Sequence, residues 1–376
     1  MNKNILILLP NAIDPQSGGL ERVYSNLIPF LKENGCNIFA LYHVRSEYDE
    51  KNDYTQVYFV DERKFLKKSK RLLFQIIETR NIDTIICAYQ DFRVLQCVSK
   101  IENVKVIHHI HNVPSVYLKN KMRILPSCLV GTFVDNILRE IRFRIRLKQA
   151  MENMMRNKQR IVILSEGFRK DLQSVYAYDD KMVVAIPNPF IIDDKFVLEK
   201  QKKDKVLLYV GRLSERQKRI SSLLNIWRKI QNSLPDYKLE VVGDGPDKDE
   251  YERIVRDKDL RRVTFRGFQD PTSFYKNAEI ECMTSNFEGF GMVLVEAMQY
   301  GCVPFVFDSF AALHDVIDNK VNGYIIPAFQ EDEYAEKLVN FLKMPEKEKM
   351  VIRCNAIIKS KQFNVENIGE RWLNLF

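Results

Sequence analysis

Short runs of apolar residues alternate along the chain with longer stretches in which apolar residues recur every three or four positions. The short runs are typical of buried β-strands, and the longer stretches are typical of amphipathic helices such as LERVYSNLIPFLKENG, which Gly35 would close. This alternation predicts an α/β fold with parallel sheets. The predicted strands are ILILLP, NIFALYHV, DTIICAY, VKVIHHIH and QRIVILS in the first half, then KVLLYVGR, KLEVVGDG, VTFRGF, IECMTS, VPFVFD and GYIIP.

A linker pattern separates the two series of strands. Residues 186–205, IPNPFIIDDKFVLEKQKKDK, combine two prolines with a charged run of low apolar content. The chain of 376 residues also exceeds the size at which one hydrophobic core keeps growing. We therefore predict two α/β domains, each open at the carboxyl ends of its strands, with a ligand cleft between them.

Composition narrows the class of protein. A hydrophobic content of 45% with 29% charged residues fits a soluble globular protein. The apolar run before Pro10 is too short for a signal peptide, and no stretch reaches the roughly 18 apolar residues that a spanning helix needs. The seven cysteines are scattered and lack CxxC spacing, which favours reduced thiols in a cytosolic protein over a disulfide framework or a zinc site.

The positive charge lies in one segment. Residues 115–160 contain eleven Lys or Arg against three Asp or Glu, which accounts for the whole net charge of +8. Such concentration suggests an anionic partner, either a membrane leaflet or a polyphosphate. On a helix, the apolar and the basic residues of this segment would lie on different sides, although FRIRLK also alternates with the period of a strand. The apolar set is Ile137, Leu138, Ile141 and Ile145, and the basic set is Arg139, Arg142 and Arg146.

Two other interpretations of this segment remain open. It could be a helix packed on its own domain with a solvated basic face. It could also bind nucleic acid, but its aromatic residues are only Tyr117, Phe133 and Phe143, so no stacking platform is evident.

Candidate chemistry in the second half begins at a predicted strand end. Gly211 closes a strand, and the cations Arg212 and Lys218 follow in the loop, where they could hold a diphosphate or form an ordinary solvated loop. VVGDGP, at residues 241–246, is a second strand that ends in a glycine turn.

Two glutamates in FEGFGMVLVEAM need an explanation. Glu296 lies among apolar residues, and an ionised carboxylate without a partner is expensive to bury. A vicinal diol such as a ribose would satisfy it, and so would backbone amides or an arginine. Glu288 precedes the turn Gly289–Gly291, where exposed amides and a carboxylate could bind ligand hydroxyls.

The first half offers a glycine loop and a histidine cluster. Gly18 and Gly19 open the first helix, where free amides could bind an anion, but the pattern is not GxGxxG and dinucleotide binding is disfavoured. VIHHIHN holds His108, His109 and His111 at a strand end. The set is incomplete for a metal, so a polar or acid/base role at the strand end is favoured.

Together these motifs resemble the retaining GT-B glycosyltransferases of family 4, over essentially the whole chain and most strongly from about 205 to 328. Segments SEGFRKDL, IPNP and EAMQYGCVPFVFDSF…DVIDNKVNGYIIP are also similar, in a form typical of bacterial capsule and lipopolysaccharide enzymes. The matched motifs are Glu-x7-Glu at Glu288 and Glu296, Gly-Arg-Leu…Lys at Gly211, Arg212, Leu213 and Lys218, Gly-x-Gly-Pro at 243–246, and Gly-Gly at Gly18 and Gly19.

The resemblance implies a GT-B architecture of two Rossmann-like domains facing each other across a cleft. An acceptor-side domain would cover residues 1–186 and a nucleotide-sugar-binding domain residues 187–361, with a helix at 362–376 returning to the first.

The resemblance also implies residue roles. Arg212 and Lys218 would neutralise the donor diphosphate, and His111 would lie beside the transferred sugar as a catalytic residue, together with Glu288. No metal or cofactor is implied beyond the nucleotide-sugar substrate. GRLSERQKRI lacks the family's frequent Lys-Gly pair, which leaves Arg216 as an alternative to Lys218. The donor-binding set would be Gly18, Gly19, Arg212, Lys218, Gly243, Gly289, Phe290, Gly291 and Glu296, with the ribose on Glu296.

The implied activity is metal-independent transfer of a hexose, with retention, from a nucleoside diphosphate, with UDP expected. The acceptor would be a saccharide or lipid-linked saccharide in surface polysaccharide synthesis. The expected location is cytoplasmic, peripheral on the inner face of the membrane, with residues 115–160 on anionic lipid. The alternatives are a nucleotide-sugar epimerase or hydrolase on the same fold and a non-enzymatic nucleic-acid binder.

Overall fold

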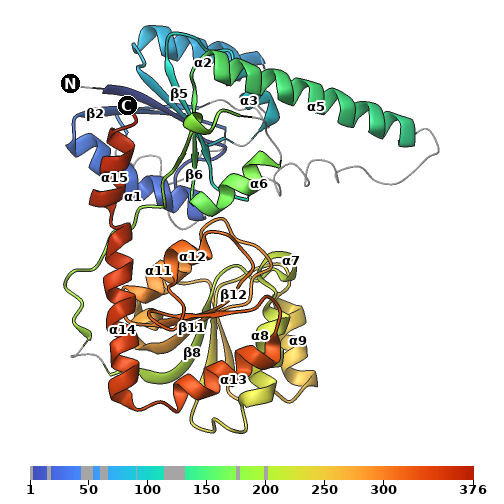
Figure 1. Cartoon of the computed structure of the whole chain (residues 1–376), viewed down its shortest axis with the longest axis vertical. Coiled ribbons are helices and arrows are strands. Elements are labelled where there is room, and N and C mark those ends of the chain that lie inside the picture. Colours follow the sequence, from blue (N-terminus) through green and yellow to red (C-terminus); the bar gives the residue numbers. More distant parts are fainter. Residues whose placement is uncertain are drawn as a thin grey trace. The chain divides into compact units, whose positions relative to one another are not determined.

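The computed structural model describes residues 3–14, 18–43, 54–59, 67–89, 91–113, 132–174, 178–198 and 202–376, without the side chains at 59, 132–140 and 143. The chain forms two compact units (Figure 1). The N-terminal unit comprises Met1–Pro189 and Val365–Phe376, and the C-terminal unit comprises Phe190–Asn364. The first unit is therefore built from two separate stretches of chain.

The described part of the N-terminal unit contains a seven-stranded sheet of order β3-β2-β1-β4-β5-β6-β7. All neighbouring strands are parallel. The order reverses between β1 and β4, which is the topological switch point of a doubly wound fold. The strands are β1 (Lys3–Leu8), β2 (Cys36–Tyr42), β3 (Gln56–Phe59), β4 (Thr84–Cys87), β5 (Lys105–Ile110), β6 (Arg160–Ile163) and β7 (Val183–Ala185).

Helices cover the sheet of the N-terminal unit because their apolar residues fall on one side. In α1, for example, Tyr24, Leu27 and Leu31 are buried at helical spacing. The α-helices are α1 (Gly19–Glu33), α2 (Lys67–Thr79), α3 (Phe92–Val98), α5 (Thr132–Arg156), α6 (Arg169–Gln173) and α15 (Val365–Leu373), and short 3-10 turns are η1 (Glu166–Phe168) and η2 (Asp180–Met182).

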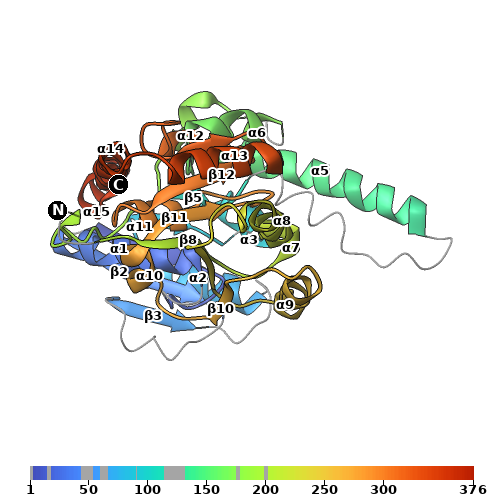
Figure 2. The ribbon, with the colours of Figure 1, turned by 90° about the horizontal axis from the view of Figure 1, so that it is seen from below.

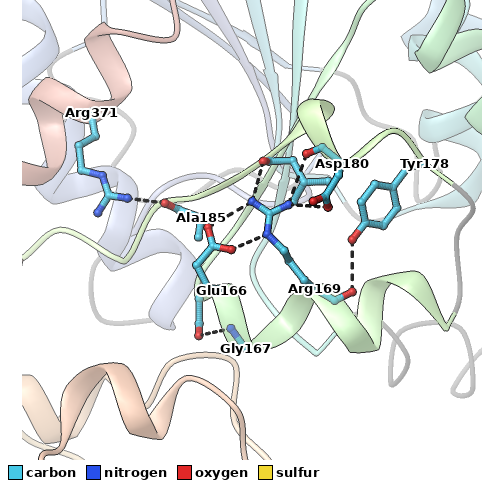
Figure 3. Close-up of polar contacts among 9 residues, drawn as sticks. Glu166, Gly167, Arg169, Tyr178, Asp180, Ala185 and Arg371 are labelled. Carbon is cyan, nitrogen blue, oxygen red and sulfur yellow. Dashed lines mark hydrogen bonds and ion pairs between the residues drawn. The ribbon is translucent and has the colours of Figure 1, made fainter.

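Helix α15 completes this unit from the far end of the chain. Ile368 and Trp372 are buried in the same cluster as Tyr24 of α1. A Cβ added at Gly369 would lie 2.3 Å from the ring of Phe30, so α1 and α15 approach closely only because position 369 has no side chain. The guanidinium of Arg371 donates a further hydrogen bond, to the carbonyl of Ala185 (Figure 3).

The segment SEGFRKDL is organised around Arg169. Its guanidinium pairs with the carboxylates of Glu166 and Asp180 and donates to the carbonyl of Val183 at 3.0 Å (Figure 3). Tyr178 donates to the carbonyl of Arg169 at 3.2 Å. These contacts connect the helical turn after β6 to β7. The segment SEGFRKDL, which resembles the family's sequences, therefore stabilises the N-terminal unit.

The C-terminal unit contains a six-stranded sheet of order β10-β9-β8-β11-β12-β13, again with parallel neighbours. The switch point lies between β8 and β11. The strands are β8 (Asp204–Val210), β9 (Lys238–Val242), β10 (Val263–Gly267), β11 (Ala278–Met283), β12 (Val303–Phe307) and β13 (Tyr324–Ile326).

Both faces of this sheet are covered. The core on one face includes residues of α8, α9 and α13, and the core on the other includes residues of α10 and α11. Figure 2 shows α8 and α9 on one side of β8 and α10 and α11 on the other. The helices are α7 (Glu215–Lys218), α8 (Ile220–Ile230), α9 (Lys248–Asp257), α10 (Thr272–Asn277), α11 (Met292–Met298), α12 (Leu313–Val316), α13 (Glu331–Leu342) and α14 (Glu346–Ser360), followed by the turn η4 (Lys361–Phe363).

The predicted α/β fold of two Rossmann-like parallel-sheet domains is confirmed. Every predicted strand overlaps an observed one, although Val44 of the second run lies outside the described residues. Strands β3 and β7 were not predicted. The segment from Thr132 to Arg156 is helical rather than extended, whereas residues 115–131 of the basic segment lie outside the described residues. No helix in the described ranges is long and apolar enough to cross a membrane.

Candidate functional site

Two loops meet at the switch point of the C-terminal unit. The first follows β8 and carries Gly211, Arg212 and Lys218, and the second follows β11 and carries Glu288. Because β8 and β11 are parallel neighbours, their carboxyl ends lie at the same edge of the sheet. This edge is the usual ligand-binding position of an open α/β sheet.

The turn after β9 packs directly on the turn after β8. A Cβ added at Gly243 would lie 1.9 Å from the carbonyl oxygen of Gly211, and one added at Gly245 would lie 2.3 Å from that of Leu213. Gly243 also has φ +137°, which other residues rarely adopt. The amide of Leu213 donates to the carbonyl of Asp244 at 2.8 Å. The glycines of VVGDGP therefore fix the path of the chain at Arg212.

Lys218 and Glu288 form the centre of the site. The ammonium of Lys218 lies 2.6 Å from Glu288 Oε1, and the exposed fractions of the two side chains are 14% and 8%. Ser285 Oγ donates to the same oxygen at 2.6 Å. The amide of Gln217 lies 3.5 Å from Oε2. The carboxylate is thus held on both oxygens by groups from both loops.

Backbone contacts hold the two loops together. The amide of Asn286 donates to the carbonyl of Gln217 at 2.7 Å, and Thr284 Oγ1 donates to the carbonyl of Arg219 at 3.0 Å. Arg219 has φ +48°, and its guanidinium lies over the ring of Phe329 at 4.3 Å. Helix α7 is therefore fixed against the residues after β11. Arg212 and Arg216, by contrast, have exposed side chains.

Glu296 is buried in α11, where it accepts a hydrogen bond from the hydroxyl of Tyr275 at 3.2 Å. This partner is a phenol of the same unit. At the start of α11, Gly291 has φ +77°, and a Cβ there would lie 3.1 Å from Leu294 and from Phe310. Phe290 is buried, with its ring 5.6 Å from that of Phe363.

A third glutamate, which the sequence reasoning missed, lies in β11. Glu281 has no exposed surface, and its Oε1 accepts from the amide of Val210 at 3.2 Å. Its Oε2 has no hydrogen-bond partner among the described residues. Burial raises the pKa of this carboxyl well above its usual range, and the nearby Glu296 raises it further. The carboxyl of Glu281 therefore favours its protonated form, and its hydrogen bond with Val210 joins β11 to the end of β8.

The glycine pair and the histidines lie in the N-terminal unit. Gly18 precedes α1, and Gly19 is its first residue. A Cβ at Gly18 would lie 2.7 Å from a carboxyl oxygen of Glu21, so the Glu21 side chain approaches this loop closely because position 18 has no side chain.

His109 and His111 pack against α1. The hydroxyl of Tyr24 lies 2.9 Å from His109 Nδ1, and the rings of the two histidines are 3.6 Å apart. Burial lowers the pKa of His111 to about 3, so its imidazole is neutral at physiological pH. Its Nε2 has no hydrogen-bond partner in the described part of the chain. His108 differs, because it bonds to Gln159 at 2.8 Å inside the core.

The structure therefore brings Arg212, Lys218, Gly243 and Glu288 to the carboxyl edge of the C-terminal sheet and buries Glu296 in α11 against Tyr275. It places Gly18, Gly19 and His111 around α1 in the N-terminal unit. The described residues contain no group of three His, Cys, Asp or Glu side chains that could hold a metal ion.

Comparison with known proteins supports a relationship to glycosyltransferases. Residues 190–356 match the family "Glycosyl transferases group 1". A lipopolysaccharide 1,6-galactosyltransferase of Salmonella typhimurium is 24% identical over 85% of each chain. A Campylobacter jejuni α-1,4-N-acetyl-D-galactosaminyltransferase, whose name gives a diphosphoundecaprenol-linked saccharide as its substrate, is 26% identical over 52% of this chain and 54% of its own.

The fold is shared along nearly the whole chain. The structure of Anabaena HepE in complex with UDP-glucose superposes with a TM-score of 0.76 at 18% identity, covering 99% of this chain and 98% of that one. In sequence, however, the match spans only 38% to 61% of the length of five curated relatives. The chain thus has the GT-B fold and is similar to glycosyltransferases, and its residues 190–356 match the glycosyl transferases group 1 family.

Proposed function

We propose that this protein is a retaining glycosyltransferase that uses a nucleoside-diphosphate sugar, with UDP as the expected nucleotide. The observation that carries the proposal is the largely buried Lys218–Glu288 pair at the switch point of the sheet, within the residues that match the glycosyl transferases group 1 family. In this pair a cation lies beside a carboxylate. The cation can bind the diphosphate of such a donor, and the carboxylate can accept hydrogen bonds from the hydroxyls of its sugar.

The cations serve the leaving group. Arg212 and Lys218 neutralise the negative charge that develops on the diphosphate as its bond to the sugar breaks. Lys218 is the better fixed of the two, because Glu288 holds its ammonium, whereas Arg212 is exposed and must order around the ligand. Two positive charges beside the diphosphate support a metal-independent reaction.

Glu288 and Glu296 serve the two sugars of the donor. Glu288 Oε1 already accepts from Lys218 and Ser285, so Oε2 is the oxygen that can accept from a hydroxyl of the transferred sugar, together with the amides of Gly289–Gly291. Glu296 accepts from the ribose. In the N-terminal unit, Gly18 and Gly19 contact the phosphates of the donor. The neutral His111 lies beside the transferred sugar.

The acceptor is proposed to be a saccharide or a lipid-linked saccharide of a surface polysaccharide. The Salmonella and Campylobacter relatives support this class by the substrates in their names. Helix α5 supports a location on the inner face of the membrane, because Ile141 and Ile145 are exposed beside the basic residues Arg142 and Arg146.

The deciding experiment is a donor screen with the pure protein. UDP- and GDP-sugars are incubated with and without lipid-linked and free saccharide acceptors, and nucleotide release and products are followed by chromatography and NMR. We expect an acceptor-dependent product whose anomeric configuration equals that of the donor. Inversion would refute the retaining mechanism, and UDP release with epimerised or free sugar in the absence of acceptor would favour the epimerase or hydrolase alternative.

A further inference from the structure

A pocket lies at the amino edge of the C-terminal sheet, opposite the carboxyl edge that carries Lys218 and Glu288. It is formed by the amino ends of β8 and β11, the residues before β9 and the first turns of α14, and its volume is about 690 Å³. Since β8 has seven residues, this edge is roughly 20 Å from Gly211. We call it the amino-edge pocket, and its lining is Leu198, Lys202, Lys203, Asp204, Lys205, Tyr237, Glu279, Glu346, Lys349, Met350 and Arg353.

The wall of this pocket holds more buried positive charge than negative charge. Lys349 and Arg353 are buried, and both donate to the single oxygen Oε1 of Glu279, at 2.7 and 2.8 Å. Glu279 is the only buried carboxylate among the lining residues, and its other oxygen accepts from the hydroxyl of Tyr237. One carboxylate is thus shared by two cations, whereas buried charges are normally paired.

Lys203 adds a third cation with no carboxylate bonded to its ammonium in the described ranges. Its Nζ donates instead to the carbonyls of Tyr275, Lys276 and Tyr300, at 2.8, 3.0 and 2.6 Å. Burial lowers the pKa of Lys203 to about 8, because the charged ammonium is taken out of water.

Arg353 also offers an unused donor. One terminal nitrogen pairs with Glu279 and the other with Glu346, which is largely exposed. The buried Nε has no hydrogen-bond acceptor among the described residues, which do not include 199–201 beside the pocket. A buried guanidinium N–H without an acceptor is costly, and an anion in the pocket would satisfy it.

From the cavity, the excess of buried cations and the unused Arg353 Nε, we propose that the amino-edge pocket binds a small polyanion bearing phosphate or carboxylate groups. The volume exceeds what one phosphate fills, and the apolar parts of Tyr237, Leu198 and Met350 can contact the rest of such a molecule. The pocket uses none of the residues assigned to the sugar donor, so it is a separate site.

The test is calorimetric titration of the full chain with inorganic pyrophosphate and, separately, citrate, in 150 mM NaCl. We expect at least one probe to bind with a dissociation constant below about 1 mM. Tighter binding of pyrophosphate would indicate a ligand with phosphate groups, and tighter binding of citrate would indicate a ligand with carboxylate groups. In Lys202→Glu and Met350→Glu, which add negative charge to the pocket without removing the buried network, binding should weaken at least tenfold.

Lys347→Glu is the matched control, because Lys347 is an exposed residue of α14 outside the pocket and undergoes the same charge change as Lys202. Its affinity should equal that of the unaltered chain. Pyrophosphate can also occupy the donor site, so Lys218→Ala serves to weaken that site, and the binding that remains should keep the affinity of the amino-edge pocket. Undetectable binding of both probes would overturn the proposal. Equal affinity in Lys202→Glu, Met350→Glu and Lys347→Glu would also overturn it, since the anion would then bind elsewhere.

Discussion

Lys218 and Glu288 depend on each other, because each is the charged partner of the other in a nearly buried position. When a diphosphate takes up part of the positive charge of Lys218, Ser285 and Gln217 remain to hold Glu288 in place. Removing Lys218 therefore has two consequences. The site loses a cation, and a buried carboxylate loses its ionic partner, which costs stability. Removing the exposed Arg212 has only the first consequence.

This difference predicts two distinct phenotypes. Arg212→Ala and Lys218→Ala should each lower turnover about a hundredfold or more, given ~2.7–4 kcal/mol for a group that stabilises a developing oxyanion. Only Lys218→Ala should also lower the melting temperature. Steady-state kinetics and thermal denaturation measure the two effects. Arg216→Ala is the comparison variant, and a loss of turnover there with normal turnover in Lys218→Ala would assign the diphosphate to Arg216.

Glu281 leads to a prediction about pH. The folded protein retains a proton on Glu281 that the unfolded chain releases above a pH of about 4.3, so this group makes the folded state less stable as pH rises. Glu281→Gln keeps an oxygen for the amide of Val210 and cannot ionise. The variant should gain stability relative to the parent between pH 5 and 8, by at most about 1.4 kcal/mol per pH unit.

Denaturant unfolding at several pH values checks this expectation. The exposed Glu78→Gln is the control and should show no such pH-dependent gain. A constant difference between Glu281→Gln and the parent at all pH values would mean that Glu281 is ionised in the folded protein.

The alternation of polar and apolar residues in β11 explains why Glu281 was not a candidate from the sequence, whereas Glu288 and Glu296 were. In AEIECM, Glu279 and Glu281 alternate with Ile280 and Cys282, which is the pattern of a strand with one solvated face. The structure buries both glutamates because helices cover both faces of the sheet. Alternation within one strand carries no information about what packs on its polar face.

The two edge strands of the N-terminal sheet were not predicted from the sequence, although both edge strands of the C-terminal sheet were. β3 and β7 are the two outermost strands of the N-terminal sheet and have four and three residues. Such short strands bury too few residues to produce a clear apolar run, whereas the central strands β1 and β4 are covered on both sides and read as continuous apolar segments. In the N-terminal sheet, the central strands could therefore be predicted and the two edge strands could not.

The contact between the β8 and β9 turns can be tested with two glycines. Gly243→Ala should abolish UDP binding and destabilise the C-terminal unit, because its Cβ would collide with the carbonyl of Gly211. Gly267→Ala is the matched control, since Gly267 also has a positive φ but no atom within 4 Å of an added Cβ. Calorimetry with UDP measures the result, and equal UDP affinity in the two variants would contradict a role for this contact in positioning Arg212.

Helix α5 can be tested as a membrane-binding element. Figures 1 and 2 both show its first part extending beyond the rest of the N-terminal unit, and Ile141 and Ile145 are about half exposed. The chain should co-sediment with vesicles containing phosphatidylglycerol at low salt, less so at high salt, because each base near the surface is worth about 1 kcal/mol. Neutral vesicles should not bind it.

The double variant Ile141→Asp/Ile145→Asp should reduce this co-sedimentation. Ile358→Asp is the control, because Ile358 is an exposed apolar residue of α14. Equal binding to neutral and anionic vesicles, or none to either, would remove electrostatic docking and leave the transferase proposal unchanged.

At the scale of the whole molecule, the N-terminal unit depends on a helix that follows the C-terminal unit in the chain. Trp372 and Ile368 of α15 are part of the core that contains β1 and α1. The C-terminal unit, in contrast, is one continuous segment. Damage to α15 should therefore affect one unit and leave the other intact.

Gly369→Val tests this dependence, since its side chain would displace Phe30 and separate α15 from α1 at a cost of about 1–3 kcal/mol or more. We expect hydrogen exchange to accelerate in β1 and α1 and to remain unchanged in Phe190–Asn364. Glu370→Val, at the exposed neighbouring position, should leave both units unchanged. Uniform acceleration across the chain would show that the two units unfold as one.

The position of α15 also sets an order of events during synthesis. After Pro189 has left the ribosome, the 175 residues of Phe190–Asn364 must be translated before α15 appears, which takes roughly 10 to 35 s at 5–20 residues per second. Throughout this interval the surface of α1 that receives Trp372 is uncovered in the nascent chain. A segment translated after the C-terminal unit thus completes a domain that emerges before that unit, and the nascent N-terminal unit exposes an apolar surface to which chaperones can bind in the meantime.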